Sequence, residues 1–377
     1  MKVLFVTTNW PTESSPVNGT FVREHARAAA ERAEVAVLYL ERDAARRGVV
    51  DVMPIRGEEP PAWRARYRRF GRPISYAAFA AGPLVALRRL RRQGFDPDVL
   101  HAHSFLSALP ALMLGRIYGK PVLYTEHWGI FLADNPGRLS PAMTRAARGA
   151  LERASLVLPV SNELGDALRV LAPGTRFRVI PNAVDERLFR PAERRPRDRG
   201  TRLVTAGLLD TDRKGVDVLL EALSRLSELD GIHLDVVGDG AMRPGYERLT
   251  RRLGLEHAVT FHGLKSKPEL AALMRGGDLF VLPSRYDNNP CVLLEAMASG
   301  LPAVATRVGG VPEALGETAG VLVDPSDPES LAAGIEDALE RLDDFDREQI
   351  ARRAHERYGR EAISAQLADV YAEVAAR

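Results

Sequence analysis

The segment Asn288-Asn289-Pro290-Cys291 has the composition of a helix start that could bind an anion. It follows a predicted strand at 279–282, and Asn289 would be the N-cap with Pro290 in the first helical position. Free backbone amides at a helix N-terminus favour negative charge, because the helix dipole adds to their hydrogen-bonding capacity. We therefore predict a pyrophosphate site at Asn288–Cys291 that needs no metal ion.

Glu295 is the unusual residue of the same helix, because both of its sequence neighbours on either side are apolar. A lone buried carboxylate costs several kcal/mol unless it is paired or hydrogen-bonded. The two hydroxyls of a ribose would satisfy it. A glutamate on a solvated helix face is the alternative, which the apolar neighbours disfavour.

A second candidate segment runs from Gly207 to Gly215 between a predicted strand and a predicted helix. Gly207 permits a tight exit from the strand. Lys214 is the only lysine between residues 121 and 264 in a chain that otherwise uses arginine. A compact ammonium suits a point contact with a phosphate oxygen, with Arg213 beside it. A solvated loop lysine explains this segment equally well when it is taken alone.

Glycines after two other strands indicate places where a ligand could approach the backbone. Gly238 follows a strand in Val236-Val-Gly-Asp-Gly240, and Gly19 opens a predicted helix at 21–33. Each signal is weak by itself. A simple helix cap is the alternative for Gly19.

His127 follows a predicted strand at 122–125, where a parallel sheet presents side chains to a ligand. A histidine there can bridge hydrogen bonds near neutral pH, although it could equally satisfy a loop carbonyl. His101 and His103 have no cysteine or acidic cluster nearby, so we interpret them as structural and predict no metal site.

The composition is that of a folded globular protein. The 377 residues are 45% hydrophobic and 27% charged, and the single cysteine, Cys291, excludes an intrachain disulfide. No apolar run reaches the ~18 residues of a membrane span. The N-terminal apolar stretch, 3–6, is too short for a signal peptide. These features predict a cytoplasmic location.

Charge is distributed unevenly between the two halves. Residues 1–190 carry 28 Lys/Arg against 18 Asp/Glu, a net charge of +10, and residues 191–377 carry 24 against 32, a net charge of −8. A basic first half suggests a phosphate-bearing acceptor, an anionic membrane surface or a nucleic acid.

Short aliphatic runs alternate with helical patterns along the chain, which predicts βαβ units and an α/β fold with two parallel sheets. The expected strands are 3–7, 35–40, 99–102, 122–125, 156–160, 177–180, 203–206, 233–237, 259–262, 279–282, 303–306 and 320–323. The segment 191–200 reads as a linker. We expect domains at 1–190 and 201–356, with a helix at 357–377 packing back on the first domain.

Together these segments resemble the retaining glycosyltransferases of family 4, also called group 1, in their polysaccharide-synthesising branch. The resemblance covers almost the whole chain and rests on short motifs in both halves. These are Asn18–His25, Val179–Asp185 with Phe189 and Pro191, Gly238–Gly240, Phe261-His262-Gly263, Leu282-Pro283-Ser284 and the Asp287/Glu295 pair separated by seven residues. The resemblance implies the GT-B fold, two facing Rossmann-like domains with a cleft between them.

The resemblance also implies residue roles. Asp287 contacts the donor sugar hydroxyls, Glu295 holds the nucleotide ribose and His127 approaches the transferred sugar. The first acid is usually glutamate, so Asp287 is a departure. Leu208 is another, because many members place an arginine there as a partner of the lysine matching Lys214. Arg213 is the candidate substitute.

The implied reaction is metal-independent sugar transfer from a nucleoside-diphosphate sugar to a hydroxyl acceptor with retained configuration, without a cofactor. The setting would be synthesis of a cell-surface polysaccharide or glycolipid. In the donor domain, His262 lies where the family expects a nucleotide contact. An epimerase of the same fold and a non-catalytic nucleotide-sugar-binding subunit are the alternatives.

Residues 62–92 carry nine arginines and no acidic residue, interleaved with aromatic residues such as Trp63, Tyr67 and Phe79. This pattern suits an anionic membrane surface or a nucleic acid. The sugar-transfer residues disfavour nucleic acid, so we expect a lipid-linked or phosphate-bearing acceptor and peripheral membrane docking. An ordinary core helix at 75–90 with solvated arginines is the equal alternative.

Overall fold

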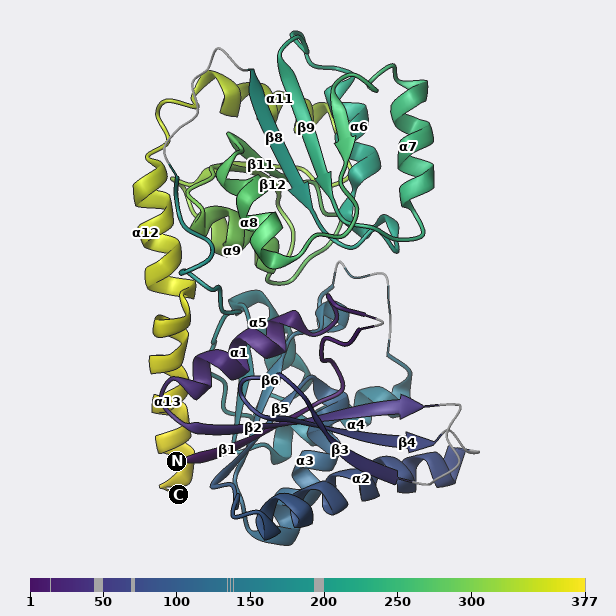
Figure 1. The fold of residues 1–377 in the computed structure, drawn as a ribbon, viewed down its shortest axis with the longest axis vertical. Helices are drawn as coiled ribbons and strands as arrows, with labels where there is room; N and C mark the ends of the chain where they lie inside the picture. The colour runs from purple at the N-terminus through teal and green to yellow at the C-terminus, as the bar shows by residue number, and fades with distance from the viewer. Residues whose placement is uncertain are drawn as a thin grey trace. The chain divides into compact units, whose positions relative to one another are not determined.

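A computed structural model describes residues 1–13, 15–43, 50–68, 72–133, 135, 137, 139–192 and 200–376. The chain forms two compact units (Figure 1). The first unit consists of Met1–Ala183 and Arg360–Arg377, and the second unit of Val184–Gly359.

The first unit is built on a seven-stranded sheet with the strand order β3-β4-β2-β1-β5-β6-β7. All neighbouring strands are parallel except β3 and β4. The strands are β1 (Lys2–Thr7), β2 (Glu34–Asp43), β3 (Val50–Ile55), β4 (Ala62–Arg68), β5 (Val99–His103), β6 (Val122–Glu126) and β7 (Leu156–Pro159). The central strands are buried along almost their whole length and largely apolar, because helices cover both faces of the sheet.

Six helices of the described residues and one 3₁₀ turn complete the first unit. They are α1 (Thr20–Ala30), α2 (Arg72–Arg92), α3 (Phe105–Tyr118), η1 (Gly129–Phe131), α4 (Pro141–Arg153), α5 (Asn162–Leu171) and α13 (Arg360–Ala375). The predicted C-terminal helix corresponds to α13, which packs against α1. Ile363, Leu367 and Tyr371 of α13 are buried in the same core as β1.

The second unit contains a six-stranded parallel sheet with the order β10-β9-β8-β11-β12-β13. Its strands are β8 (Thr201–Ala206), β9 (Ile232–Val237), β10 (Val259–Phe261), β11 (Leu279–Leu282), β12 (Ala303–Thr306) and β13 (Gly320–Val323). The helical elements are η3 (Asp212–Lys214), α6 (Val216–Leu223), α7 (Arg243–Arg252), α8 (Lys267–Arg275), α9 (Cys291–Ala298), α10 (Val311–Leu315), α11 (Pro328–Glu340) and α12 (Arg347–Tyr358).

The second unit begins at Val184, earlier in the chain than the predicted domain boundary at 190. Val184 and Phe189 are buried in the core of the second unit, and the Val184 amide donates to the Tyr358 carbonyl at 2.8 Å. Apolar packing therefore assigns the residues after Ala183 to the second unit. Most of the predicted linker, 193–199, lies outside the described residues.

The basic segment 62–92 is largely part of the first unit's framework. On β4, Arg66 Nε donates to Glu41 Oε2 at 2.7 Å, and Arg64 Nη1 lies 3.7 Å from the same oxygen. Trp63, Tyr67 and Phe79 pack against the core, so the aromatic side chains are accounted for by packing. The side chain of Arg68 and all of Arg69 lie outside the described part.

No helix among the described residues is long and apolar enough to cross a membrane.

Candidate active site

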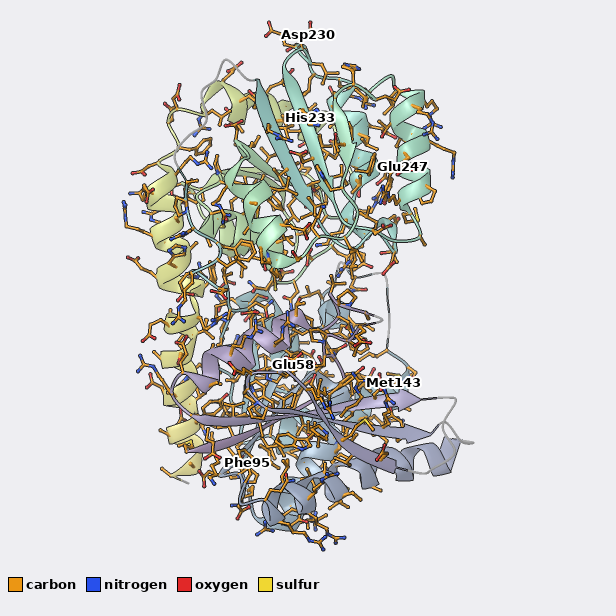
Figure 2. The ribbon with its side chains drawn as sticks, in the orientation of Figure 1. Glu58, Phe95, Met143, Asp230, His233 and Glu247 are labelled. Atoms are coloured by element: carbon orange, nitrogen blue, oxygen red, sulfur yellow. The ribbon has the colours of Figure 1, made fainter. Side chains whose placement is uncertain are left out.

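Strand order locates the candidate donor site of the second unit. The order reverses between β8 and β11, and open parallel sheets bind ligands at the carboxyl ends of strands at such a point. The loops 207–215 and 283–290 follow these two strands. They contain most of the predicted donor residues, and we call this end of the sheet the donor edge. His233, labelled in Figure 2, stands near the amino end of β9 and marks the opposite edge.

Lys214 and Asp287 form the central ion pair of the donor edge. Lys214 Nζ donates to Asp287 Oδ2 at 2.6 Å, and both side chains are about one-tenth exposed. Asp287 also accepts from the Ser284 hydroxyl at 3.3 Å and from the Asn288 amide at 3.1 Å. Two residues 73 positions apart in the sequence are thus held in contact at the switch point of the sheet.

The local charges determine the ionisation of Asp287. Burial by itself would raise its pKa, but the positive charges of Lys214 and Arg213 outweigh burial and lower it. The Arg213 guanidinium lies 5.9 Å from the centre of the Tyr286 ring. Arg213 therefore acts electrostatically on the same carboxylate as Lys214.

Arg285 joins the two loops of the donor edge, a contact that the sequence did not predict. Its guanidinium makes two hydrogen bonds to the Asp217 carboxylate, at 2.9 and 2.6 Å, and one to the Asp212 carbonyl at 2.7 Å. Its backbone amide donates to the Arg213 carbonyl at 2.8 Å. A bidentate arginine pair restricts orientation as well as distance, so it fixes the loop that carries Lys214.

Helix α9 begins at Cys291 with Pro290 in the N-cap position, so the predicted Asn289 cap is wrong by one residue. The first-turn amides of the helix still lie at the donor edge, as predicted. Asn288 and Asn289 are buried, and the Asn288 carbonyl accepts from the Gly310 amide at 2.7 Å. Burial raises the pKa of the Cys291 thiol to about 12, so this thiol is neutral at physiological pH.

Glu295 is 3% exposed, as its apolar sequence neighbours predicted, and it forms an ion pair with Lys267 at the start of α8. The sequence analysis did not select Lys267. The argument that selected Lys214 applies to it too, because it is one of only five lysines in the chain. The pair supplies the partner that a buried carboxylate requires.

Close packing of backbones explains Gly238, whereas His262 belongs to the framework of the sheet. Gly238 has a φ of 144°, and a Cβ there would lie 1.9 Å from the Gly207 carbonyl oxygen. Gly207 and Lys214 line the same small depression at the strand ends. The His262 ring is 2.7 Å from Asp235 Oδ1, a buried atom that also accepts from Arg202.

The corresponding edge of the first unit carries four imidazoles, from His25, His101, His103 and His127, and we call it the imidazole edge. His25 Nε2 is 2.9 Å from the Pro181 carbonyl oxygen. His101 is bonded to Tyr371 and Thr125 at 2.9 and 2.7 Å, which fits the structural role expected of it.

His127 is held at both ring nitrogens. Its Nδ1 is 3.1 Å from Asn182 Oδ1, and its Nε2 is 2.9 Å from His103 Nδ1. An amide oxygen only accepts, so His127 Nδ1 carries the proton and Nε2 accepts from His103. Asn182 lies in the segment that matched the family's motif, but its contact with His127 could not be read from the sequence.

The four imidazoles are neutral near pH 7. Burial lowers the pKa of His25 to about 4. The pKa values of His101, His103 and His127 also lie well below the ordinary value, first because of burial and then because of neighbouring imidazoles. Within the described residues, His25, His103 and His127 each offer a ring nitrogen within 4.8 Å of the others. The prediction of no metal site did not anticipate this arrangement.

Gly19 is the N-cap residue of α1 and has a φ of 69°. A Cβ at this position would lie 2.4 Å from the Asn9 carbonyl carbon, so the loop after β1 packs directly on the glycine. The structure therefore assigns Gly19 a role in helix capping and loop packing in the first unit.

Two family models match the chain and together span both units. Residues 19–188 match "Glycosyltransferase Family 4", and residues 200–341 match "Glycosyl transferases group 1".

Curated relatives include a glycogen synthase from Mycobacterium tuberculosis, which is 33% identical over 265 residues. That alignment covers 67% of this chain and 63% of the relative, so the chain spans less than two thirds of the glycogen synthase's length. An alpha-D-kanosaminyltransferase from Streptomyces kanamyceticus is 30% identical over 328 residues, covering 79% of this chain and 83% of the relative.

Solved structures with the same fold include a sucrose-phosphate synthase from Thermosynechococcus elongatus, with a TM-score of 0.79 and 23% identity over 100% of this chain and 99% of that one. HepE from Anabaena, solved with UDP, has a TM-score of 0.77 and 20% identity over 99% of this chain and 100% of the other. From its motifs, its relatives and its two Rossmann-like units, the chain belongs to glycosyltransferase family 4 and has the GT-B fold.

Proposed function

We propose that this protein transfers a glycosyl group from a nucleoside-diphosphate sugar to a hydroxyl acceptor, with retention of anomeric configuration and without a metal ion. The observation that carries the proposal is the Lys214–Asp287 ion pair beside the start of α9 at the switch point of the second sheet. Cationic side chains and helix amides directed at one place suit a leaving diphosphate.

Each donor-edge residue has a distinct task in this proposal. Lys214, Arg213 and the amides at Asn288–Cys291 stabilise the negative charge that develops on the departing diphosphate. Asp287 binds hydroxyls of the donor sugar, which requires it to share its oxygens with Lys214. Glu295 binds the ribose hydroxyls while its carboxylate is in an ion pair with Lys267.

His127 orients the transferred sugar in this proposal and does not carry a proton. A general base needs a pKa near the working pH, whereas the pKa of half-buried His127 lies well below its ordinary value. Both of its ring nitrogens are held by Asn182 and His103.

We propose attack on the same face of the anomeric carbon from which the diphosphate leaves. A double displacement would require a carboxylate free to act as a nucleophile. Asp287 is the acidic residue that the family resemblance places at the donor sugar, and it accepts hydrogen bonds from Lys214, Ser284 and Asn288. An acid bound in this way is a poor nucleophile.

A donor panel tests the proposal directly. The full-length protein is incubated with UDP-, GDP- and ADP-sugars, with and without saccharide, polyol and lipid-linked acceptors, and the release of nucleoside diphosphate is measured. Acceptor-dependent release supports transfer. Conversion of the sugar without nucleotide release indicates an epimerase, and binding without turnover indicates a non-catalytic subunit.

We further propose that the acceptor is a saccharide or glycolipid used in cell-surface polymer synthesis, as the motif at Asn18–His25 suggests. For membrane docking, Arg64 and Arg66 are poor candidates because Glu41 already pairs with them. The exposed residues Val85, Arg88 and Arg92 have the spacing of one face of α2 and are the better candidates.

Liposome flotation tests this docking face. Binding that rises with anionic lipid and falls with salt, and that weakens in Arg88→Ala/Arg92→Ala but not in Arg64→Ala/Arg66→Ala, supports it. Equal recovery with neutral and anionic vesicles would remove membrane docking from the proposal and leave the transfer reaction unaffected.

A further inference from the structure

Glu126, the last residue of β6, is a completely buried carboxylate surrounded by hydrogen-bond donors. Its Oε1 accepts from the backbone amides of His127 and Trp128, both at 2.8 Å. Its Oε2 accepts from the Phe105 amide at 3.1 Å and from the Tyr124 hydroxyl. Four donors thus bind the Glu126 carboxylate. Neither the family resemblance nor the proposed mechanism assigns this residue a role.

These contacts connect two segments that follow neighbouring strands. The Phe105 amide belongs to the first turn of α3, which starts after β5, and the amides of His127 and Trp128 form the exit from β6. Ser104, the N-cap residue of α3, has a φ of 71° and makes no side-chain capping bond. The Glu126 carboxylate therefore accepts from one of the helix-start amides that have no partner within the helix.

The two residues that directly follow β6, His127 and Trp128, have side chains of types that bind sugars. His127 is the residue that we propose to orient the transferred group, and Trp128 next to it is 43% exposed. The Trp128 ring lies 5.8 Å from the Phe105 ring, so the two segments joined by Glu126 also meet through their aromatic side chains. Moving the Glu126 carboxylate would move both segments.

We propose that Glu126 is a positioning residue for the sugar-transfer reaction, which holds His127 and Trp128 in their working orientation through their backbone amides. The inference rests on the proposed function. It distinguishes Glu126 from a buried acid that only stabilises the fold, because it ties the rate of transfer to the charge of this carboxylate.

The ionised carboxylate can accept from all four donors at once, whereas the protonated acid adds a donor of its own among them. Burial raises the pKa of Glu126 to about 7, against the opposing hydrogen bonds from Tyr124 and from the amides of Trp128, His127 and Phe105. No lysine or arginine of the described residues is among the groups that shift this pKa. The neighbouring imidazoles have lowered pKa values and therefore stay neutral at pH values near 7, where Glu126 titrates.

Glu126→Gln is the informative variant, because its amide nitrogen places a donor where the carboxylate accepted. We expect a fall in kcat of about 10-fold or more, while the affinity for nucleoside diphosphate, measured by calorimetry, stays within about twofold of wild type. Hydrogen exchange should speed up in peptides covering 104–107 and 126–131. Glu126→Asp, which keeps the charge, should recover part of the rate.

Tyr124→Phe tests the same inference without altering the carboxylate. The Tyr124 hydroxyl lowers the pKa of Glu126, so its removal should shift the acid limb of the kcat profile to higher pH. Glu152→Gln on α4, where Glu152 pairs with Arg148 on an exposed helix face, is the matched control and should change neither profile nor rate. If Glu126→Gln does not fold, the Tyr124→Phe profile decides.

The outcomes separate this inference from the proposed function. A wild-type protein without transfer on any donor and acceptor overturns the proposed function, and the hydrogen-exchange arm then still tests the structural part of the inference. An active wild type whose rate is matched by Glu126→Gln, or whose acid limb is unmoved in Tyr124→Phe, overturns the positioning role alone.

Discussion

The two sheets have closely similar strand orders but opposite chemistry at their carboxyl ends. The donor edge of the second unit holds ion pairs, Lys214 with Asp287 and Lys267 with Glu295. The imidazole edge of the first unit holds rings that burial keeps neutral, among them His127. The fold thus specifies where ligands meet each sheet, and the side chains decide which ligand charge each edge can accept.

This contrast follows from the proposed reaction. A departing nucleoside diphosphate carries negative charge that must be stabilised, whereas a transferred hexose is neutral and needs shape and hydrogen bonds. Unpaired positive charge at the imidazole edge would attract a diphosphate to the wrong unit. The predictions that follow test whether charge matters at the donor edge and whether the imidazoles of the other edge are neutral.

The largest effect is expected from Lys214→Ala. Removing a charge-assisted hydrogen bond worth about 1.5–3 kcal/mol should lower kcat/KM by about 10- to 150-fold. Lys265→Ala, which removes a lysine paired with exposed Glu269, is the control and should be close to wild type. In the double variant Lys214→Ala/Asp287→Ala the two effects should not add, because the residues are partners.

A Lys214→Ala enzyme with wild-type turnover at low donor concentration would show that the donor edge does not act through its charge. The circular dichroism spectrum of each variant should match that of wild type, so that lost activity is not mistaken for lost structure.

The next effect concerns acid stability. The pKa of His25 is lowered to about 4 in the folded chain, so between pH 6.5 and 4 the unfolded state binds more protons and stability falls as pH falls. His25 alone should cost about 2 kcal/mol by pH 5. Protonation of Glu126 acts in the opposite direction because its pKa is raised, but four imidazoles outweigh one carboxyl.

Tryptophan fluorescence can measure this effect in the first unit alone, because Trp10, Trp63 and Trp128 are the three tryptophans of the chain. Urea unfolding followed at pH 7.5, 6 and 5 should show a midpoint that falls with pH. A midpoint independent of pH would mean that the imidazoles are charged in the folded state, which would remove the neutral edge from the comparison.

A smaller effect is expected from Glu295→Gln. The amide keeps the shape of the side chain but loses its charge and its ion pair with Lys267, so the affinity for nucleoside diphosphate should fall by about 10-fold. Glu247→Gln on α7, labelled in Figure 2, replaces a partly exposed glutamate that is also ion-paired, with Arg243, and serves as the control. Equal affinities for the two variants would contradict the assignment of Glu295 to the ribose.

Metal removal should have no effect. Lys214 and Arg213 supply positive charge at the donor edge, so dialysis against a chelator should leave transfer unchanged. Activity that is lost and then restored by zinc would point to the trio His25, His103 and His127, and restoration by magnesium or manganese would point to the donor edge.

Features encoded in short stretches of sequence could be predicted. Lys214 was selected as a rare lysine in a loop between a predicted strand and a predicted helix, and Asp287 was selected by the family resemblance from its spacing to Glu295. All six predicted strands of the second unit are present, since each is a short apolar run after a helical pattern. The domain boundary differed because Val184 and Phe189 show where they belong only through packing.

Features that depend on distant partners could not be predicted. β3 and β4 were missed, because alternating arginines on β4 hid a strand on which Arg64 and Arg66 are paired by Glu41 of β2. The predicted strand at 177–180 is reduced to a bridge between Phe177 and Val157. The Lys267 partner of Glu295 and the Phe105 amide that binds Glu126 come from other elements, so the sequence shows the two acids but not these contacts.

The path of the chain through the second unit has a practical consequence. Val184, where the chain enters this unit, is bridged to Gly359, where it leaves. A segment whose two ends adjoin can be cut out and inserted elsewhere without stretching its host. We therefore expect that the second unit can be exchanged between relatives at two neighbouring junctions, Val184 and Gly359. A chimera that takes the second unit from a relative therefore needs a junction at both points. A single junction would also replace α13, which packs in the first unit.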